Sequence, residues 1–190
     1  YRNPFDTTDG AAIARSIARL FEDEISFQGA DTIAALIMEP VLGAGGVIVP
    51  HETFMPLMRE ICDRHGILLI ADEVITAFGR TGAWTGSRLF GVKPDFMSTA
   101  KAITNGYYPF GAVMIADKVA QLFESSKTAA GSIGHGYTYS GHPVGAAAAL
   151  ATLKETRKQN VAANAGARGE ELMAGLEALK DRHELVVADR

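Results

Sequence analysis

The sequence predicts an α/β fold in which a mostly parallel sheet carries helices on both faces. Short apolar runs alternate along the chain with longer segments whose apolar residues recur at helical spacing. One of these helical segments lies between two apolar runs, which is the order of a βαβ unit. The composition agrees with a globular fold, because 47% of the 190 residues are hydrophobic and 21% are charged.

The chain opens with a predicted helix and a predicted strand. Residues 12–24 form the helix, and Asp9 or Thr8 is its N-cap. Its apolar residues stand at Ile13, Ile17, Leu20 and Phe21. Residues 32–38 form the strand, and the glycines of residues 43–46 mark a loop after it.

A second helix and a second strand follow directly. Residues 53–65 form the helix, and Gly66 ends it. Its apolar face consists of Phe54, Leu57, Met58, Ile61 and Cys62. Residues 66–71 are continuously apolar, as in a strand that is buried on both faces. The two strands and the helix between them form the expected βαβ unit.

The second half of the chain contains two short strands and two long helices. Residues 96–99 and 111–115 form the strands, and an alanine-rich helix runs from Pro143 to about residue 158. A further helix over about residues 161–182 has an apolar stripe of Leu172, Leu176 and Leu179. A last strand is expected at residues 184–188. The alternation of predicted strands and helices changes near residues 159–168, and this is the one candidate domain boundary.

Composition and charge also exclude several functional classes. The formal net charge is −4 and the charges are interspersed without a basic stripe, so we expect no nucleic-acid or membrane partner. No apolar run is long enough for a bilayer, and the first residues do not resemble a signal peptide. Cys62, the single cysteine, is expected to be a buried small hydrophobe in a reducing cytoplasm. Because the chain begins at Tyr1 and not at methionine, we expect a partial chain from a longer protein.

An acid and a lysine stand at the ends of two apolar runs. Asp72 follows the run 66–71 at the carboxyl end of its strand, where open parallel sheets bind ligands, and Lys101 follows the run 96–99. A lysine amine forms a Schiff base with an aldehyde, and a carboxylate keeps a pyridine nitrogen protonated. At about 4 Å from the pyridine nitrogen, that carboxylate favours the protonated ring by roughly 4 kcal/mol, or about three pKa units. The pair indicates a site for pyridoxal phosphate.

Four sequence motifs resemble those of the class III (omega) aminotransferases, which are pyridoxal-phosphate-dependent enzymes of fold type I, and they stand in the same order as in that family. They are residues 38–40, 72–82, 100–102 and 135–143, so the resemblance extends over nearly the whole chain. It implies that residues 1–160 are part of the cofactor-binding large domain and that residues 161–190 start the C-terminal small domain. Residues 137–143 are most similar to those of enzymes that pass amines or omega-amino acids to pyruvate.

The resemblance also implies a role for individual residues. Lys101 bonds to the cofactor and then moves the proton between the substrate Cα and the cofactor C4′. Asp72 pairs with the ring nitrogen, Val74 presses on one face of the ring, and Glu39 lies near the side of its phenolic oxygen. Thr138 reaches the phosphate of the partner subunit's cofactor, which implies a homodimer with composite active sites.

The residues themselves leave other interpretations open. Val74 could serve only in core packing, Glu39 could be a plain exposed glutamate, and Thr138 could cap the helix that starts at Pro143. His135 and His142 are expected to have structural roles, because no third ligand stands at metal spacing, and no metal site is predicted.

The resemblance implies a ping-pong transaminase that takes an amine donor and a keto acid acceptor. Two alternatives remain: another reaction on the same cofactor, such as a decarboxylase or an aminomutase, and a non-catalytic dimerising α/β domain. The family's phosphate loop, its ring-stacking aromatic residue and its carboxylate-binding arginine fall outside the matched residues, so we expect this fragment alone to be inactive. The donor, the enantiopreference and the choice between dimer and tetramer stay open.

Overall fold

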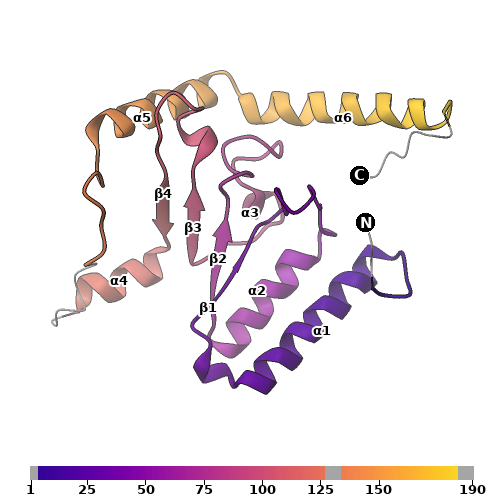
Figure 1. Ribbon diagram of the computed structural model, residues 1–190, viewed down its shortest axis with the longest axis horizontal. Coiled ribbons are helices and arrows are strands. Elements are labelled where there is room, and N and C mark those ends of the chain that lie inside the picture. The colour runs from indigo at the N-terminus through magenta and orange to yellow at the C-terminus, as the bar shows by residue number, and fades with distance from the viewer. Residues whose placement is uncertain (1–3, 127–133, 184–190) are drawn as a thin grey trace.

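A four-stranded sheet forms the centre of the chain, as Figure 1 shows. The computed structural model describes residues 4–126 and 134–183. The strands stand in the order β1 (Ala35–Met38), β2 (Leu68–Asp72), β3 (Phe96–Thr99) and β4 (Ala112–Ile115). β1, β2 and β3 are parallel, and β4 pairs antiparallel with β3. The prediction of an α/β fold with a mostly parallel sheet is confirmed.

Two helices, α1 (Gly10–Gln28) and α2 (Phe54–His65), form between the capping residues that the sequence indicates. Asp9 caps α1, because its Oδ1 accepts a hydrogen bond from the Ala11 amide at 2.9 Å. Gly66 ends α2 in the left-handed conformation at φ 69°, which a residue without Cβ adopts at little cost.

The core lies between these helices and one face of the sheet. Its buried residues are Ala18, Ile25, Met55, Met58, Ile61, Cys62, Ile67, Leu69, Ala71 and Val92. Burying one large side chain of this kind contributes about 1.5–3 kcal/mol. Leu69 and Ala71 alternate with half-exposed neighbours along β2, so the buried face of the strand is the one toward α2.

The apolar face predicted for α1 is wrong in part. Ile17 and Leu20 are 36% and 57% exposed, whereas the buried residues of the helix are Ala14, Ala18 and Ile25. The apolar stripe of α1 is wider than its contact with α2. The two alanines and Ile25 lie one and two turns apart on the side that faces the core, and they take the buried positions.

The strand predicted at residues 32–38 is shorter than expected. Residues Ala30–Thr32 instead form one turn of 3₁₀ helix. The Thr32 hydroxyl donates to the carbonyl oxygens of Gln28 and Gly29, so this segment closes the end of α1 and does not join the sheet. The glycine loop 43–46 is the tip of a small hairpin in which Leu42 pairs with Ile48.

The remaining helices lie at the two ends of the sheet. They are α3 (Gly86–Leu89), α4 (Asp117–Ser125), α5 (Pro143–Lys158) and α6 (Val161–Lys180). α5 and α6 run across the edge at which β1, β2 and β3 end (Figure 1). α6 buries none of its described residues, so its predicted leucine stripe is not part of this core. The strand predicted at residues 184–188 lies outside the described residues.

α6 approaches the loop after β2 very closely. A Cβ on Gly82, whose φ is +80°, would lie 3.2 Å from the Cα of Gly166, so this contact requires glycine. The domain boundary near residue 160 stays a prediction, although α6 begins there. Within residues 4–126 and 134–183, no helix has the length and hydropathy to span a membrane.

Candidate functional site

Three predicted site residues meet at one edge of the sheet. Glu39 follows the last residue of β1, Asp72 is the last residue of β2, and Lys101 comes shortly after the end of β3. Asp72 is the register partner of Ser98 in β3. Because β1, β2 and β3 are parallel, their carboxyl ends share an edge, and the fold brings the three side chains to it.

Lys101 stands in a strained backbone conformation. It opens a one-turn 3₁₀ helix, Lys101–Ile103, with a φ of +46°, and a side chain in this left-handed region costs about 1–2 kcal/mol. Buried Thr104 holds the turn, since its amide donates to the Lys101 carbonyl at 3.3 Å and its hydroxyl donates to the Tyr108 carbonyl at 2.6 Å. Strain that the surroundings hold in this way is typical of functional sites.

The Lys101 amine is available for chemistry. The residue is exposed, and in the described part of the chain its Nζ makes no hydrogen bond or ion pair. A lysine that served only to neutralise a carboxylate would lie beside one. Lys101 therefore provides, at the carboxyl edge of the sheet, an amine without a hydrogen-bond or ion-pair partner among the described residues.

Only one oxygen of the Asp72 carboxylate is hydrogen-bonded within the described residues. Its Oδ1 accepts a hydrogen bond from the Val74 amide at 3.0 Å, whereas Oδ2 accepts none from the described residues. Strand β2 ends at Asp72 and the chain turns, so the two-residue strand period does not set the direction of the Val74 side chain. The proposed contact of half-buried Val74 with a ring stays a prediction.

Glu39 is bound to the hairpin that follows it. It is half-buried, and its Oε2 accepts a hydrogen bond from the Gly43 amide at 2.9 Å. A Cβ on Gly43 would lie 3.2 Å from that oxygen and 2.1 Å from Cδ1 of Ile75, in the turn after Asp72. Glu39 is therefore not a plain exposed glutamate, and its loop packs against the turn that follows Asp72.

Glu73, which is not among the predicted site residues, is the most buried acid at this edge. It is 0% exposed. Its oxygens accept hydrogen bonds from four donors: the Thr76 hydroxyl at 2.5 Å, the Gly86 amide at 2.7 Å, and the Ser87 amide and hydroxyl at 2.6 and 2.5 Å. No local pattern reveals it, because three of these donors come from the short helix α3, which periodicity does not detect.

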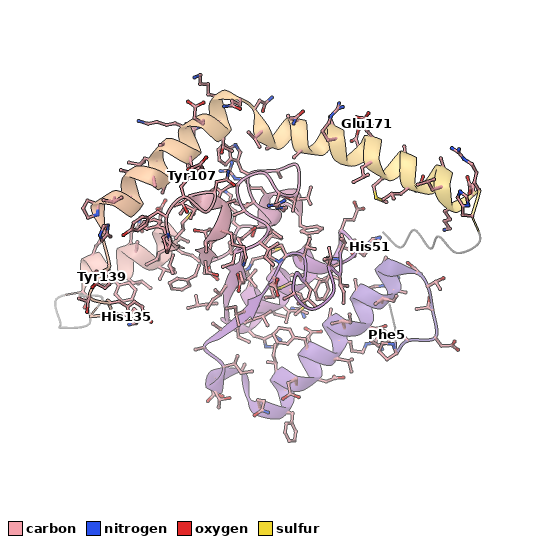
Figure 2. The ribbon with its side chains drawn as sticks, turned by 45° about the horizontal axis from the view of Figure 1, so that its top comes forward. Phe5, His51, Tyr107, His135, Tyr139 and Glu171 are labelled. Carbon is pink, nitrogen blue, oxygen red and sulfur yellow. The ribbon has the colours of Figure 1, made fainter. Side chains whose placement is uncertain are left out.

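Thr138 comes from a separate part of the chain, the loop before α5. It is exposed in a turn closed by two hydrogen bonds of 2.9 Å between Tyr137 and Ser140. Its neighbours His135 and Tyr139 lie beyond β4 at the outer end of α5, as Figure 2 shows. The alternative in which Thr138 caps α5 is wrong, because the N-cap position is His142 and no side chain caps that helix.

His142 connects the Thr138 loop to the chain after Lys101. Its Nδ1 lies 3.2 Å from the Tyr108 hydroxyl, and the two rings are 5.2 Å apart. This contact agrees with the structural role expected for His142. Among the residues that the structure describes, no cluster of three or more histidine, cysteine, aspartate or glutamate side chains could hold a metal ion.

A buried charge cluster stands at the opposite edge of the sheet. Asp95, just before β3, is 1% exposed and accepts hydrogen bonds from Lys118 at 2.5 Å, the Leu69 amide at 2.7 Å and Arg59 at 2.9 Å. Burial raises the pKa of the Asp95 carboxyl, but these three donors outweigh burial and the pKa is lowered. An open cleft of about 540 Å³ lies beside it, lined by Arg59, Lys93 and Lys118 among others.

Comparison with known proteins points to one family. Residues 2–189 match the family model described as aminotransferase class-III. The chain is 45% identical over 148 residues to a mitochondrial gamma-aminobutyrate transaminase 1 of Oryza sativa subsp. indica, covering 78% of this chain and 29% of the relative. It is 46% identical over 144 residues to a putrescine–pyruvate aminotransferase of Pseudomonas aeruginosa, covering 76% of this chain and 31% of the relative.

A solved structure agrees with these relatives. The crystal structure of an amine transaminase from an uncultivated Pseudomonas species, in its PLP-bound form, matches with a TM-score of 0.92 and 49% identity. The match covers 97% of this chain and 42% of that one. The chain thus spans less than half the length of each of these proteins.

Proposed function

The chain belongs to the class-III aminotransferase family, and from this premise we propose that the whole protein transfers an amino group from an amine or an omega-amino acid to a keto acid such as pyruvate. The observation that carries this proposal is the placement of Asp72 and Lys101 at the ends of neighbouring parallel strands. Two relatives support the substrates, since one is a gamma-aminobutyrate transaminase and another a putrescine–pyruvate aminotransferase.

The residues at this edge fit pyridoxal phosphate, the cofactor of the family. The fit rests on two free groups, the Nζ of Lys101 and the Oδ2 of Asp72, which have no partner among the described residues. When bound, pyridoxal phosphate supplies an aldehyde that bonds to amines and a ring that accepts electrons. An unpaired amine and a half-free carboxylate are the groups that such a molecule requires of a protein.

Each residue would then have its own part in the reaction. Asp72 would stabilise a proton on the ring nitrogen, and a carboxylate near such a proton contributes roughly 4 kcal/mol at an effective dielectric near 20. Lys101 would hold the cofactor through Nζ, and the same amine would move the proton that leaves the substrate Cα. Glu39, fixed to the Gly43 amide, borders the same edge and contributes to the control of substrate access.

A second copy of the chain completes this proposal. Thr138 is exposed in the loop before α5, and it does not cap that helix. A hydroxyl in that position suits a neighbouring subunit, so we propose a homodimer in which Thr138 contacts the phosphate of the partner's cofactor. We also propose a cytoplasmic location, which the single, unpaired and buried thiol of Cys62 supports.

Product analysis on the full-length protein tests the proposed reaction. With putrescine or gamma-aminobutyrate as donor and pyruvate as acceptor, we expect alanine to accumulate in step with loss of the donor. Initial rates should give the parallel double-reciprocal lines of a ping-pong mechanism. Release of carbon dioxide, migration of the amino group within one substrate, or intersecting lines would each contradict amino transfer between two substrates.

A further inference from the structure

Glu73 is a buried carboxylate for which the described residues provide no cation. Its side chain is 0% exposed, and each oxygen accepts two hydrogen bonds. Two of the donors, the amides of Gly86 and Ser87, are backbone groups that can only donate. A carboxylate oxygen accepts about two hydrogen bonds, so both oxygens are saturated and Glu73 has no acceptor capacity left for a ligand.

The backbone of Glu73 is fixed as firmly as its side chain. Its amide donates to the Ser98 carbonyl of β3 at 2.9 Å, and its carbonyl accepts from the Ala77 amide at 3.0 Å. Glu73 therefore joins three parts of the site edge: the end of β2, the end of β3 that leads to Lys101, and the start of α3. A residue bonded on every side leaves the chain around it little freedom.

The neighbours of Glu73 are the cofactor-binding candidates themselves. Asp72 precedes it, and the Val74 amide that follows donates to Oδ1 of Asp72 at 3.0 Å. That hydrogen bond orients the Asp72 carboxylate and leaves Oδ2 free, and it exists only while the turn after Asp72 keeps its shape. Three of the four side-chain hydrogen bonds of Glu73 come from α3 and hold that turn against it, and the fourth, from the Thr76 hydroxyl, lies within the turn.

We propose that Glu73 is a positioning residue: through its hydrogen bonds to Thr76, Gly86 and Ser87 it orients the Asp72 carboxylate toward the ring nitrogen of the cofactor and in line with Lys101. This inference rests on the proposed function. It differs from a role in stability alone, because a buried carboxylate that only stabilised the fold would leave the properties of the bound cofactor unchanged.

Two buried acids make a matched test in the full-length protein. Glu73→Gln keeps the shape but turns an amide NH₂ toward the amide of Gly86 or of Ser87, whereas Asp95→Asn changes a carboxylate at the opposite edge of the sheet. Ser87→Ala removes one hydroxyl donor and is the mild variant that carries the test should Glu73→Gln not fold. The thermal midpoint, the dissociation constant of pyridoxal phosphate and the pH profile of its visible band are measured for each.

The three readouts separate positioning from stability. We expect Glu73→Gln and Asp95→Asn both to lower the thermal midpoint, and Glu73→Gln alone to weaken cofactor binding by about tenfold. Glu73→Gln should also raise the midpoint of the pH profile by about half a unit or more, because a less positively charged ring leaves the proton at Lys101 Nζ more tightly held. Ser87→Ala should shift both quantities in the same direction by less.

Comparing the double variant Asp72→Asn/Glu73→Gln with Asp72→Asn alone completes a double-mutant cycle. In the Asp72→Asn background, Glu73→Gln should cause no further shift of the pH profile, because the carboxylate that Glu73 positions is absent. A wild-type profile in Glu73→Gln and Ser87→Ala, an equal shift in Asp95→Asn, or an equal shift in the Asp72→Asn background would overturn the inference. A wild-type protein that forms no visible band would instead refute the proposed function, so the two failures are distinguishable.

Discussion

Asp72 of β2 is paired in register with Ser98 of β3, and Lys101 follows Ser98 along the chain just after β3 ends. This pairing places a carboxylate and an amine from separate parts of the sequence at one edge of the sheet. A shift of one residue in β2 would turn the Asp72 side chain to the other face of the sheet. The proposed chemistry therefore depends on the register of β2 and β3 as much as on the identity of the two residues.

The charge of Asp72 is expected to be essential for the rate. Asp72→Asn removes an interaction of roughly 4 kcal/mol, so we expect the kcat of the full-length enzyme to fall by about 10²–10³-fold. Asp72→Glu keeps the charge in a displaced position and should lose less. Steady-state kinetics of the two variants test this, and an asparagine variant with wild-type kcat would show that Asp72 does not act on the cofactor.

The composite site is tested by mixing two inactive variants. If Thr138 serves the partner's cofactor, dimers of one Lys101→Ala subunit and one Thr138→Ala subunit contain one complete site, and activity returns on mixing. The complete site combines Lys101 of one subunit with Thr138 of the other. If Thr138 serves its own subunit, both sites in the mixed dimer are defective, and the activity after mixing does not exceed that of the separate variants.

The Asp95 cluster is expected to stabilise the fold without taking part in the reaction. Asp95→Asn breaks a buried ion pair, which typically costs 3–5 kcal/mol, so we expect a loss of about that size in the free energy of unfolding. Asp63→Asn removes a 60% exposed carboxylate that pairs with the same Arg59, and it should cost less than about 1 kcal/mol. Denaturant unfolding of both variants provides the comparison.

The same carboxylate predicts a pH dependence of stability. The pKa of Asp95 is lower in the folded chain than its ordinary value, so its stabilisation is complete above about pH 4, the ordinary range of an aspartate. That stabilisation is lost as the pH falls through the lowered pKa. The wild type should therefore lose more unfolding free energy than Asp95→Asn below about pH 4. Parallel pH curves would show that Asp95 does not contribute in this way.

The thiol of Cys62 is expected to be unreactive in the folded protein. Its side chain is 0% exposed in the core, and burial raises the pKa of its thiol while Arg59 lowers it and nearby acids raise it. A thiol that is both buried and protonated reacts slowly, so a coloured thiol reagent should label it only after unfolding. Rapid labelling of the native protein at neutral pH would contradict the burial of Cys62.

The sequence predicted the parts of this structure that follow from local patterns. Gly66 ends α2 and Pro143 starts α5 because each residue favours that position by itself. Asp72 and Lys101 were placed correctly at the carboxyl edge, since that follows from where buried strands end.

The parts that were missed depend on contacts between distant segments. Ile17 and Leu20 match the helical period of α1, but only the packing against the core decides that Ala14, Ala18 and Ile25 are buried instead. Three of the four side-chain hydrogen bonds of Glu73 come from α3, and no local pattern joins the two segments. The contact of Val74 with a ring and the role of Thr138 involve groups outside this chain, and they stay predictions.

The visible spectrum of the full-length protein with pyridoxal phosphate tests the central claim most directly. We expect a band that bleaches on addition of an amine donor and recovers on addition of pyruvate in the wild type and in Lys93→Ala, a lysine beside the cleft at the opposite edge. Lys101→Ala should show no such cycle. A cycle that persists in Lys101→Ala, or a wild-type protein that never forms the band, would contradict the assignment of Lys101 as the cofactor-binding lysine.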